Sequence, residues 1–247
     1  MKFPLYLTVG FGLLLLSANK SFEKTSPIIQ KIKFYQSYNC EVAEPSDIVF
    51  DPTSKSLYVV SDNGYIAEIT TEGKLVRQTE EIGIDFEGIT LADKGLVTVD
   101  ETPRNFQLRD KNWNLLQSKR ITYLGGRNKG FESVTWNQAS KTFFTATEKD
   151  PIHLFELDEN FNVLNERRLP FKVRDVSALT IHNGFLWVLS DEDRTIFKCD
   201  LATLNPVKQF LLPIINPEGL AFDEKGNLIV CSDDRERLYH FSANLFQ

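Results

Sequence analysis

Sulfur and imidazole side chains are scarce in this chain, which has three cysteines, one methionine and three histidines among 247 residues. So few cysteines exclude a disulfide framework, and since Cys40, Cys199 and Cys231 have no obvious partners, we expect three free thiols. His153 and His182 have no second histidine or cysteine at ligand spacing, which argues against a zinc site. Stability must therefore come from a packed core, which a chain of this length can form.

Basic residues are outnumbered, because 28 Lys and Arg against 34 Asp and Glu give a net charge of −6. Such a surface lacks the positive charge with which proteins bind nucleic acids, and it is repelled by anionic lipid headgroups. We therefore expect no nucleic-acid partner and no membrane contact outside the N-terminal segment. The 42% of hydrophobic and 25% of charged residues are typical of an ordinary globular domain.

The first twenty residues differ from the rest of the chain. Lys2 precedes an apolar run over residues 5–16, which is shorter than the ~20 residues of a membrane-spanning helix. This pattern is typical of a secretory signal, and because Leu16 makes a cut after Ala18 unfavourable, an uncleaved anchor is the alternative. We predict a signal peptide or N-terminal membrane anchor over 1–20 and one folded domain over 21–247. The protein is then expected in the periplasm or anchored to the plasma membrane, facing outside the cytoplasm.

One unit recurs five times along the rest of the chain, with successive units 40 to 45 residues apart. The five openings are Pro-Ser-Asp-Ile-Val-Phe-Asp (45–51), Phe-Glu-Gly-Ile-Thr-Leu-Ala (86–92), Phe-Glu-Ser-Val-Thr-Trp-Asn (131–137), Val-Ser-Ala-Leu-Thr-Ile-His (176–182) and Pro-Glu-Gly-Leu-Ala-Phe-Asp (217–223). Their first polar side chains align, and we name this shared place the opening position. The sequence predicts that it is held by Asp47, Glu87, Glu132, Ser177 and Glu218.

Three further segments follow each opening. In the first unit they are an apolar run over 56–61, an alternating segment over 65–69 and a more polar segment over 75–79. Four short strands per unit, separated by Gly, Asn and Asp turns, are typical of a β-propeller blade, whose inner strands are buried on both faces. The sequence therefore predicts an all-β fold, a five-bladed β-propeller with four antiparallel strands per blade.

The two ends of the chain complete one blade. The fifth unit has only three strands before the chain stops at Gln247, whereas the alternating segment 29–38 precedes the first opening. We predict that this N-terminal strand closes the last blade, which protects two strand edges. Cys40 and Cys231 would then lie two strands apart, too far for a disulfide that needs Cα atoms within ~7 Å.

Acidic residues stand in two loops of each unit, the loop into the first strand and the loop between the second and third strands. In a four-stranded blade these loops share one face of the disc and lie close to its axis. We expect the glutamates at the opening position to turn inward, and we expect a metal site there that Ser177 makes asymmetric. The candidate ligands are Glu87, Glu132, Glu218 and Asp47 from the openings and Asp62, Asp191 and Asp233 from the second loops, which also carry Asp100, Glu101 and Glu148.

A cluster of like charges persists only if it is neutralised, since each pair within ~6 Å costs roughly 3 kcal/mol at an effective dielectric near 20. One possible agent is a hard cation with oxygen ligands, for which Ca²⁺ is the first candidate in an exported protein. A second is internal salt bridges, and a third is protonation of the carboxyls. The basic residues that could form such salt bridges are Arg104, Lys149, Arg194 and Arg235.

Several motifs together resemble the SdiA-regulated β-propeller family over about residues 30–247. They are Glu-Pro-Ser-Asp-Ile-Val-Phe-Asp-Pro (44–52), Leu-Tyr-Val-Val-Ser-Asp-Asn-Gly (57–64), Phe-Glu-Gly-Ile-Thr (86–90), Val-Ser-Ala-Leu-Thr (176–180), Leu-Trp-Val-Leu-Ser-Asp-Glu (186–192) and Pro-Glu-Gly-Leu-Ala-Phe-Asp-Glu-Lys-Gly-Asn-Leu (217–228). The resemblance implies a bacterial envelope protein with an N-terminal signal or anchor, links to calcium in some members and no established catalytic activity. It also implies that Glu87, Glu132 and Glu218 occupy the family's repeated acidic position.

Three functions fit these observations. The first, which we favour, is a non-enzymatic binding module whose acidic mouth takes a cation, a small cationic ligand or an envelope protein. The second is a Ca²⁺-dependent hydrolase of the phytase or lactonase kind, in which a metal polarises a phosphoryl or carbonyl oxygen. The third is a scaffold that uses only its outer edges.

Overall fold

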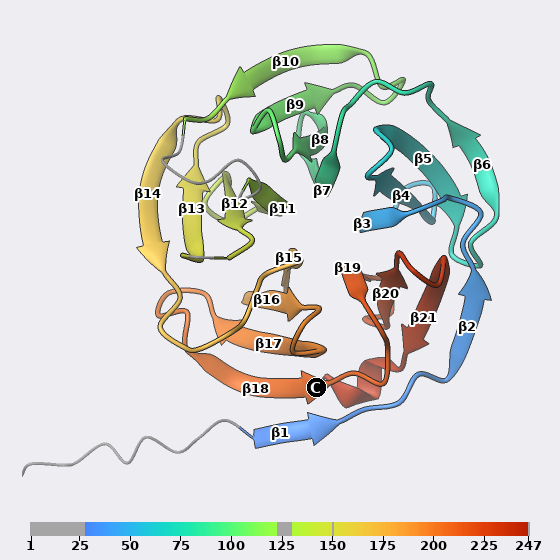
Figure 1. Cartoon of the computed structure of the whole chain (residues 1–247), viewed down its shortest axis with the longest axis vertical. Helices are drawn as coiled ribbons and strands as arrows, with labels where there is room; N and C mark the ends of the chain where they lie inside the picture. Colours follow the sequence, from blue (N-terminus) through green and yellow to red (C-terminus); the bar gives the residue numbers. More distant parts are fainter. Residues whose placement is uncertain (1–27, 123–129, 150, 247) are drawn as a thin grey trace, which may run out of the picture.

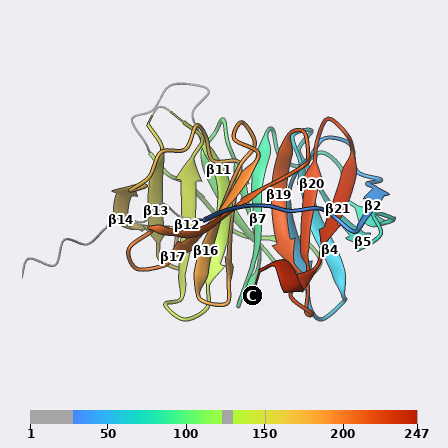
Figure 2. The ribbon, with the colours of Figure 1, turned by 90° about the horizontal axis from the view of Figure 1, so that it is seen from below.

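Five sheets stand around a central axis, and the strand that opens each of the five repeats is innermost (Figure 1). The structure is a computed structural model and describes residues 28–122, 130–149 and 151–246. Seen edge-on, the molecule is a disc whose strands run between its two faces (Figure 2). The predicted five-bladed β-propeller with four antiparallel strands per blade is confirmed.

Each of the first three blades is one continuous segment with its strands in sequence order from the axis outward. The strands are β3 (Pro45–Asp51), β4 (Ser56–Ser61), β5 (Tyr65–Thr70) and β6 (Leu75–Gln78) in the first blade, β7 (Phe86–Ala92), β8 (Gly95–Asp100), β9 (Asn105–Arg109) and β10 (Leu115–Arg120) in the second, and β11 (Phe131–Asn137), β12 (Thr142–Thr147), β13 (His153–Leu157) and β14 (Val163–Arg168) in the third.

Both of the last two blades take a strand from the N-terminal segment. Their own strands are β15 (Ala178–His182), β16 (Phe185–Ser190), β17 (Thr195–Asp200) and β18 (Pro206–Leu211) in the fourth, and β19 (Pro217–Phe222), β20 (Leu228–Ser232) and β21 (Arg237–Phe241) in the fifth. β2 (Gln36–Asn39) pairs antiparallel with β21 and completes the fifth blade, as predicted. β1 (Ile28–Lys31) pairs parallel with β18 and adds an outer strand to the fourth blade. The segment 29–38 is therefore two strands on neighbouring blades and not one.

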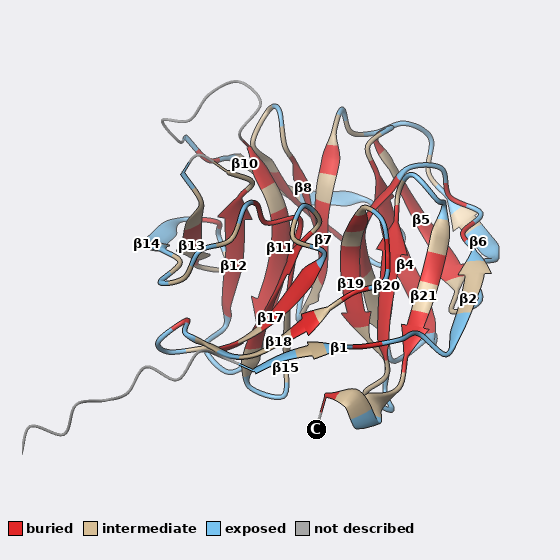
Figure 3. Cartoon of the chain, turned by 60° about the horizontal axis from the view of Figure 1, so that its bottom comes forward, coloured by how far each residue is buried: buried red, intermediate tan, exposed pale blue. Residues whose placement is uncertain are grey.

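Burial falls from the axis to the rim (Figure 3). All six residues of β4 are buried, whereas five of the six residues of β14 are exposed. The reason is that inner and middle strands are covered on both faces by neighbouring blades, while the outer strands face water. This explains why the second strand of each unit is an apolar run and the fourth is polar.

Five clusters of buried hydrophobic side chains hold the described blades together, one at each interface between neighbours. The interface between the fourth and fifth blades contains Trp187, Phe210 and Phe241. It is covered by Phe246, which follows a short 3₁₀ turn, η1 (Ala243–Leu245), and lies 5.1 Å from the Phe210 ring. Because each blade packs against two others, the ring has no exposed end blade.

The inner strands approach one another closely around the axis. A Cβ atom on Gly88 would lie 2.8 Å from the backbone of Ser133, so the close approach requires glycine there. Threonines of one blade satisfy backbone groups of the next: the N–H of Trp136 donates to Oγ1 of Thr90 at 3.2 Å. Backbone groups of the inner strands are thus hydrogen-bonded to side chains of the neighbouring blade, although the blades do not form one continuous sheet.

The three cysteines are free, as predicted, and all three are buried. The predicted signal or anchor over 1–20 lies outside the described residues. Among the residues that are described, no helix has the length and apolarity that a membrane span requires.

Candidate functional site

Carboxyl groups from all five blades line a cavity of about 180 Å³ at the axis, on the face where the inner strands begin. We name this cavity the mouth. Eight of its nine lining residues are acidic, and no described lining residue is Lys or Arg. The lining consists of Asp62, Glu87, Glu132, Glu148, Asp175, Ser177, Asp191, Glu218 and Asp233.

A β-bulge turns the opening side chain toward the mouth. In the second blade Phe86 pairs with Asp100 and Gly88 pairs with Val99, so Glu87 is the extra residue between two ladder pairs. Bulges occur between the corresponding pairs of the first, third and fifth blades. Because a bulge interrupts the alternation of side chains along a strand, it changes the direction in which the side chain of the extra residue points. This geometry explains why glutamates at the start of a buried strand can line a cavity.

The pairing corrects the alignment of the first blade by one residue. Pro45 pairs with Ser61 and Asp47 pairs with Val60, so Ser46 is the extra residue and the equivalent of Glu87. The opening position is therefore held by Ser46, Glu87, Glu132, Ser177 and Glu218, that is, by three glutamates and two serines. Ser46 Oγ donates a hydrogen bond to Asp62.

Asp47 does not line the mouth but lies beneath it, with an exposed fraction of 1%. Its carboxylate accepts hydrogen bonds from the backbone N–H groups of Ile48 at 2.8 Å and Ile89 at 3.0 Å, and also from that of Leu220. These three strands belong to the first, second and fifth blades. Burial raises the pKa of Asp47 well above its usual value. Asp47 therefore ties inner strands together and is not positioned as a ligand for a cation in the mouth.

The three glutamates at the opening position lie close to other acids. Burial, followed by the negative charges of Asp191 and Asp233, raises the pKa of Glu218 to about 9. Burial and nearby carboxylates also raise the pKa values of Glu87 and Glu132 well above 4.5. Without a cation Glu218 is therefore mainly protonated at neutral pH, and Glu87 and Glu132 keep their protons to a higher pH than an exposed glutamate does, since burial disfavours a charged carboxylate that has no positive partner.

The second-loop acids divide into two groups. Asp62, Asp191 and Asp233 line the mouth, together with Glu148. Asp100 instead caps the preceding loop, because its carboxylate accepts the N–H of Asp85 at 2.9 Å. Glu101 accepts the N–H of Gly130 at 2.9 Å and approaches Glu132, and burial raises its pKa.

Sequence reasoning missed Asp175, which lies two residues before the opening position of the fourth blade. Its carboxyl accepts a hydrogen bond from Ser190 Oγ at 2.5 Å and contacts the carboxyl of Asp191. Burial and this neighbouring carboxyl raise the pKa of Asp175 to about 7. The signal in the sequence is the pair Asp-Val-Ser at 175–177 and Asp-Phe-Glu at 85–87, which places an acid at the same offset in two units.

Internal salt bridges neutralise only the rim of the mouth. Lys149 forms ion pairs with Glu148 and, at 3.4 Å, with Glu192. Arg194 and Arg235 form no ion pair with any residue in the part of the chain that the structure describes. Protonation, which the raised pKa values indicate, and an external cation are thus the two agents that fit the centre of the mouth.

The carboxylates do not form a ready-made metal centre. Over residues 28–122, 130–149 and 151–246, no three or more His, Cys, Asp or Glu side chains converge on one point as metal ligands do. The oxygen chemistry of the lining suits a hard cation, whereas its spacing requires the side chains to close in, or water to complete the coordination.

Comparisons with known proteins agree with this architecture. The structure of glutaminyl cyclase from Myxococcus xanthus is similar, with a TM-score of 0.71 at 15% identity, over 87% of this chain and 97% of that one. At this identity the likeness shows a shared fold alone. The sequence pattern of the SdiA-regulated family matches residues 35–242, from β2 to the end of β21. The chain therefore belongs to the SdiA-regulated family.

Proposed function

We propose that this chain is an exported, non-enzymatic binding module that takes up a cation at its mouth. The observation that carries the proposal is a cavity lined by eight carboxyl groups with no described Lys or Arg among them. A protein that neutralised these groups for its own stability would be expected to place basic side chains there, as Lys149 does at the rim. A lining of carboxyl groups that no basic side chain neutralises favours a positive ligand, which binds as the protons leave.

Cation binding at the mouth is expected to release protons. Burial and neighbouring carboxylates raise the pKa of Glu218 to about 9 and that of Asp175 to about 7. A cation stabilises the ionised forms of both groups, so its binding competes with protonation. We therefore expect the affinity for the cation to increase as the pH rises from about 6 to 9.

Ca²⁺ is the first candidate for this cation. It prefers carboxylate oxygens, takes six to eight ligands in flexible geometry and commonly keeps water among them. That flexibility is compatible with a mouth whose carboxylates do not converge on one point. A small organic cation is the second candidate, since a cavity of about 180 Å³ is larger than a single metal ion needs.

The cellular setting forms part of the same proposal. The N-terminal pattern over 1–20 favours export, with the propeller in the periplasm or anchored to the plasma membrane. The partner is then an envelope protein or a small cationic ligand. The net charge of −6 disfavours nucleic acids and any membrane contact beyond the N-terminal segment.

A thermal melt tests the binding proposal. The protein is treated with EDTA, dialysed, and melted with and without Ca²⁺ or spermidine at pH 8. A ligand at 100 times its Kd adds about 2.7 kcal/mol, which for a domain of this size raises Tm by roughly 5–10 °C. The double variant Glu87→Gln/Glu218→Gln should lose most of this shift, whereas the exposed Glu72→Gln should keep it. Equal shifts in both variants, or none in the native protein, would contradict the proposal.

A hydrolase is the second candidate, and one observation favours it. The adjacent carboxyls of Asp175 and Asp191, with a pKa of about 7 for Asp175, resemble an acid–base pair suited to neutral pH. Turnover of phytate or a lactone in the presence of Ca²⁺, abolished by Asp175→Asn, would support this candidate. A protein that binds the cation and turns over neither substrate supports the binding module.

A further inference from the structure

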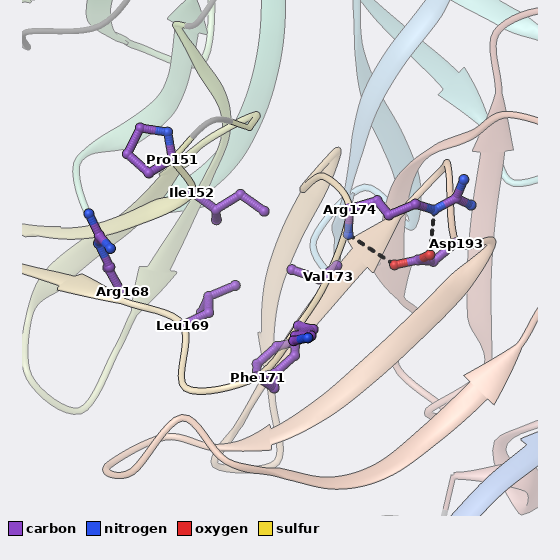
Figure 4. A pocket seen from close by; sticks show the side chains of 9 residues that line it. Pro151, Ile152, Arg168, Leu169, Phe171, Val173, Arg174 and Asp193 are labelled. Atoms are coloured by element: carbon purple, nitrogen blue, oxygen red, sulfur yellow. Dashed lines mark hydrogen bonds and ion pairs between the residues drawn. The ribbon is translucent and has the colours of Figure 1, made fainter.

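A second cavity lies on the same face of the disc as the mouth, between the third and fourth blades. Its volume is about 520 Å³, within the range of small-molecule sites. The segment 169–174, which leads from β14 toward β15, forms one side, and Pro151 and Ile152 from the loop before β13 form another (Figure 4). The lining differs from that of the mouth in both polarity and charge.

Apolar side chains form the wall of this cavity. Leu169, Phe171 and Val173 alternate with exposed residues along this segment, and all three line the cavity. Together with Ile152 they are half-buried and pack on the buried hydrophobic cluster between the third and fourth blades. An apolar ligand body in this cavity would cover surface that water now contacts, which is favourable.

Positive charge surrounds the apolar wall. Arg168 and Lys172 line the cavity, are exposed, and have no ion pair or side-chain hydrogen bond with any residue that the structure describes. Arg174 lines it on the opposite side from Arg168 (Figure 4), where its Nε donates to Oδ1 of Asp193 at 2.6 Å. Asp193 is the one acidic residue of the lining and its charge is balanced by Arg174, so an incoming anion meets two free cations and no free carboxylate.

We propose that this cavity binds a small amphiphilic anion, a compound with an apolar body and one anionic head such as a carboxylate. The body would contact Ile152, Leu169 and Phe171, and the head would pair with Arg168 and Lys172. Guanidinium and ammonium groups form the strong, charge-assisted hydrogen bonds that carboxylates accept. The inference goes beyond cation binding at the mouth and does not depend on it, since the two ligands have opposite charge and separate linings.

Isothermal titration with octanoate in EDTA-containing buffer tests the proposal, with 1-octanol and acetate as matched probes. Octanoate should bind at least tenfold more tightly than 1-octanol, which lacks the charge, or acetate, which lacks the body. The exposed double variant Arg168→Gln/Lys172→Gln should weaken octanoate binding about tenfold, which corresponds to ~1.4 kcal/mol. Ile152→Ser should weaken it about threefold.

A charge-matched control separates this site from a general effect of net charge. Arg120→Gln/Lys225→Gln removes two exposed cations elsewhere, and Arg120 ends β10 as Arg168 ends β14. This variant should bind octanoate as the native protein does. No measurable octanoate binding, equal binding of the three probes, or equal losses in the two double variants would overturn the proposal. Loss of the Ca²⁺ response alone would bear only on the mouth.

Discussion

At the scale of single residues, two kinds of buried carboxyl near the axis have opposite surroundings. Asp47 is bonded to backbone N–H groups of three strands, including those of Ile48 and Ile89. Glu218 instead faces Asp191 and Asp233, whose negative charges add to the effect of burial on its pKa. A carboxyl that accepts several N–H bonds stabilises the fold, whereas one that meets only like charges is free for a ligand. Asp47 and Glu218 stand one position apart in the repeat, yet Asp47 is a structural residue and Glu218 is a candidate binding residue.

We expect Asp47→Ala to lower the free energy of unfolding by about 2–4 kcal/mol, because it leaves buried N–H groups of three inner strands without an acceptor. Urea unfolding measured by circular dichroism checks this value. The control is Asp93→Ala, which removes an exposed ion pair with Lys141 and a hydrogen bond with Gln138 and should lower the free energy of unfolding far less. Similar losses in the two variants would show that Asp47 does not tie the strands.

At the scale of elements, the N-terminal segment was predicted in part. The strand count of the fifth unit indicates that a strand from the start of the chain must complete it, and β2 does so. The break between β1 and β2 could not be predicted, since it depends on where the segment crosses from one blade to the next. Ile32 is buried at that crossing, and the Phe34 ring lies 5.0 Å from the ring of Tyr239.

Because β2 closes the ring, proline at the first backbone hydrogen bond between this segment and β21 is expected to destabilise the fold. The N–H of Tyr35 donates to the carbonyl of His240 at 2.9 Å, and proline at position 35 has no N–H to donate. We expect Tyr35→Pro to lower the free energy of unfolding by roughly 2 kcal/mol more than Tyr35→Ala, which keeps the backbone bond. Urea unfolding of the two variants compares them directly. Equal stabilities would mean that ring closure does not depend on this pairing.

At the scale of the whole molecule, the mouth exists only because the ring is closed. Each blade contributes one or two acids to the mouth. In an isolated blade these acids would be ordinary exposed carboxylates. Ring closure brings them around a cavity of about 180 Å³, where burial raises the pKa values of Glu87, Glu132 and Glu218. The stability of the cation-free ring is therefore linked to pH.

The sign of that linkage follows from Glu218, whose pKa is raised from 4.5 to about 9 in the folded protein. The folded state keeps this proton longer than the unfolded state, so the free energy of unfolding falls as the pH rises from about 4.5 to 9. We expect Glu218→Gln, which cannot ionise, to be more stable than the native protein by roughly 1–3 kcal/mol at pH 9 and about equal to it at pH 4.5. Urea unfolding in EDTA at both values measures the difference.

Glu72→Gln serves as the control for this prediction, because Glu72 is an exposed turn residue outside the mouth. Its stability relative to the native protein should not change with pH. A Glu218→Gln variant that shows the same pH dependence as the native protein would mean that Glu218 ionises as freely in the mouth as in the unfolded chain.

The number of blades, the order of their strands, the closure by the N-terminal segment and the acidic character of one face can all be predicted from the amino-acid sequence. These features follow from local hydrophobic patterns and from counting repeats, which need no knowledge of distant contacts. That Ser46 and not Asp47 is equivalent to Glu87 could be seen only in the folded chain, because a bulge is defined by pairing across strands. The cavity beside Arg168 likewise depends on segments brought together by packing between blades, for which no local pattern in the chain provides a signal. The matching motifs at 175–177 and 85–87 mark the position of Asp175, but its contact with Asp191 is set by the folded blade.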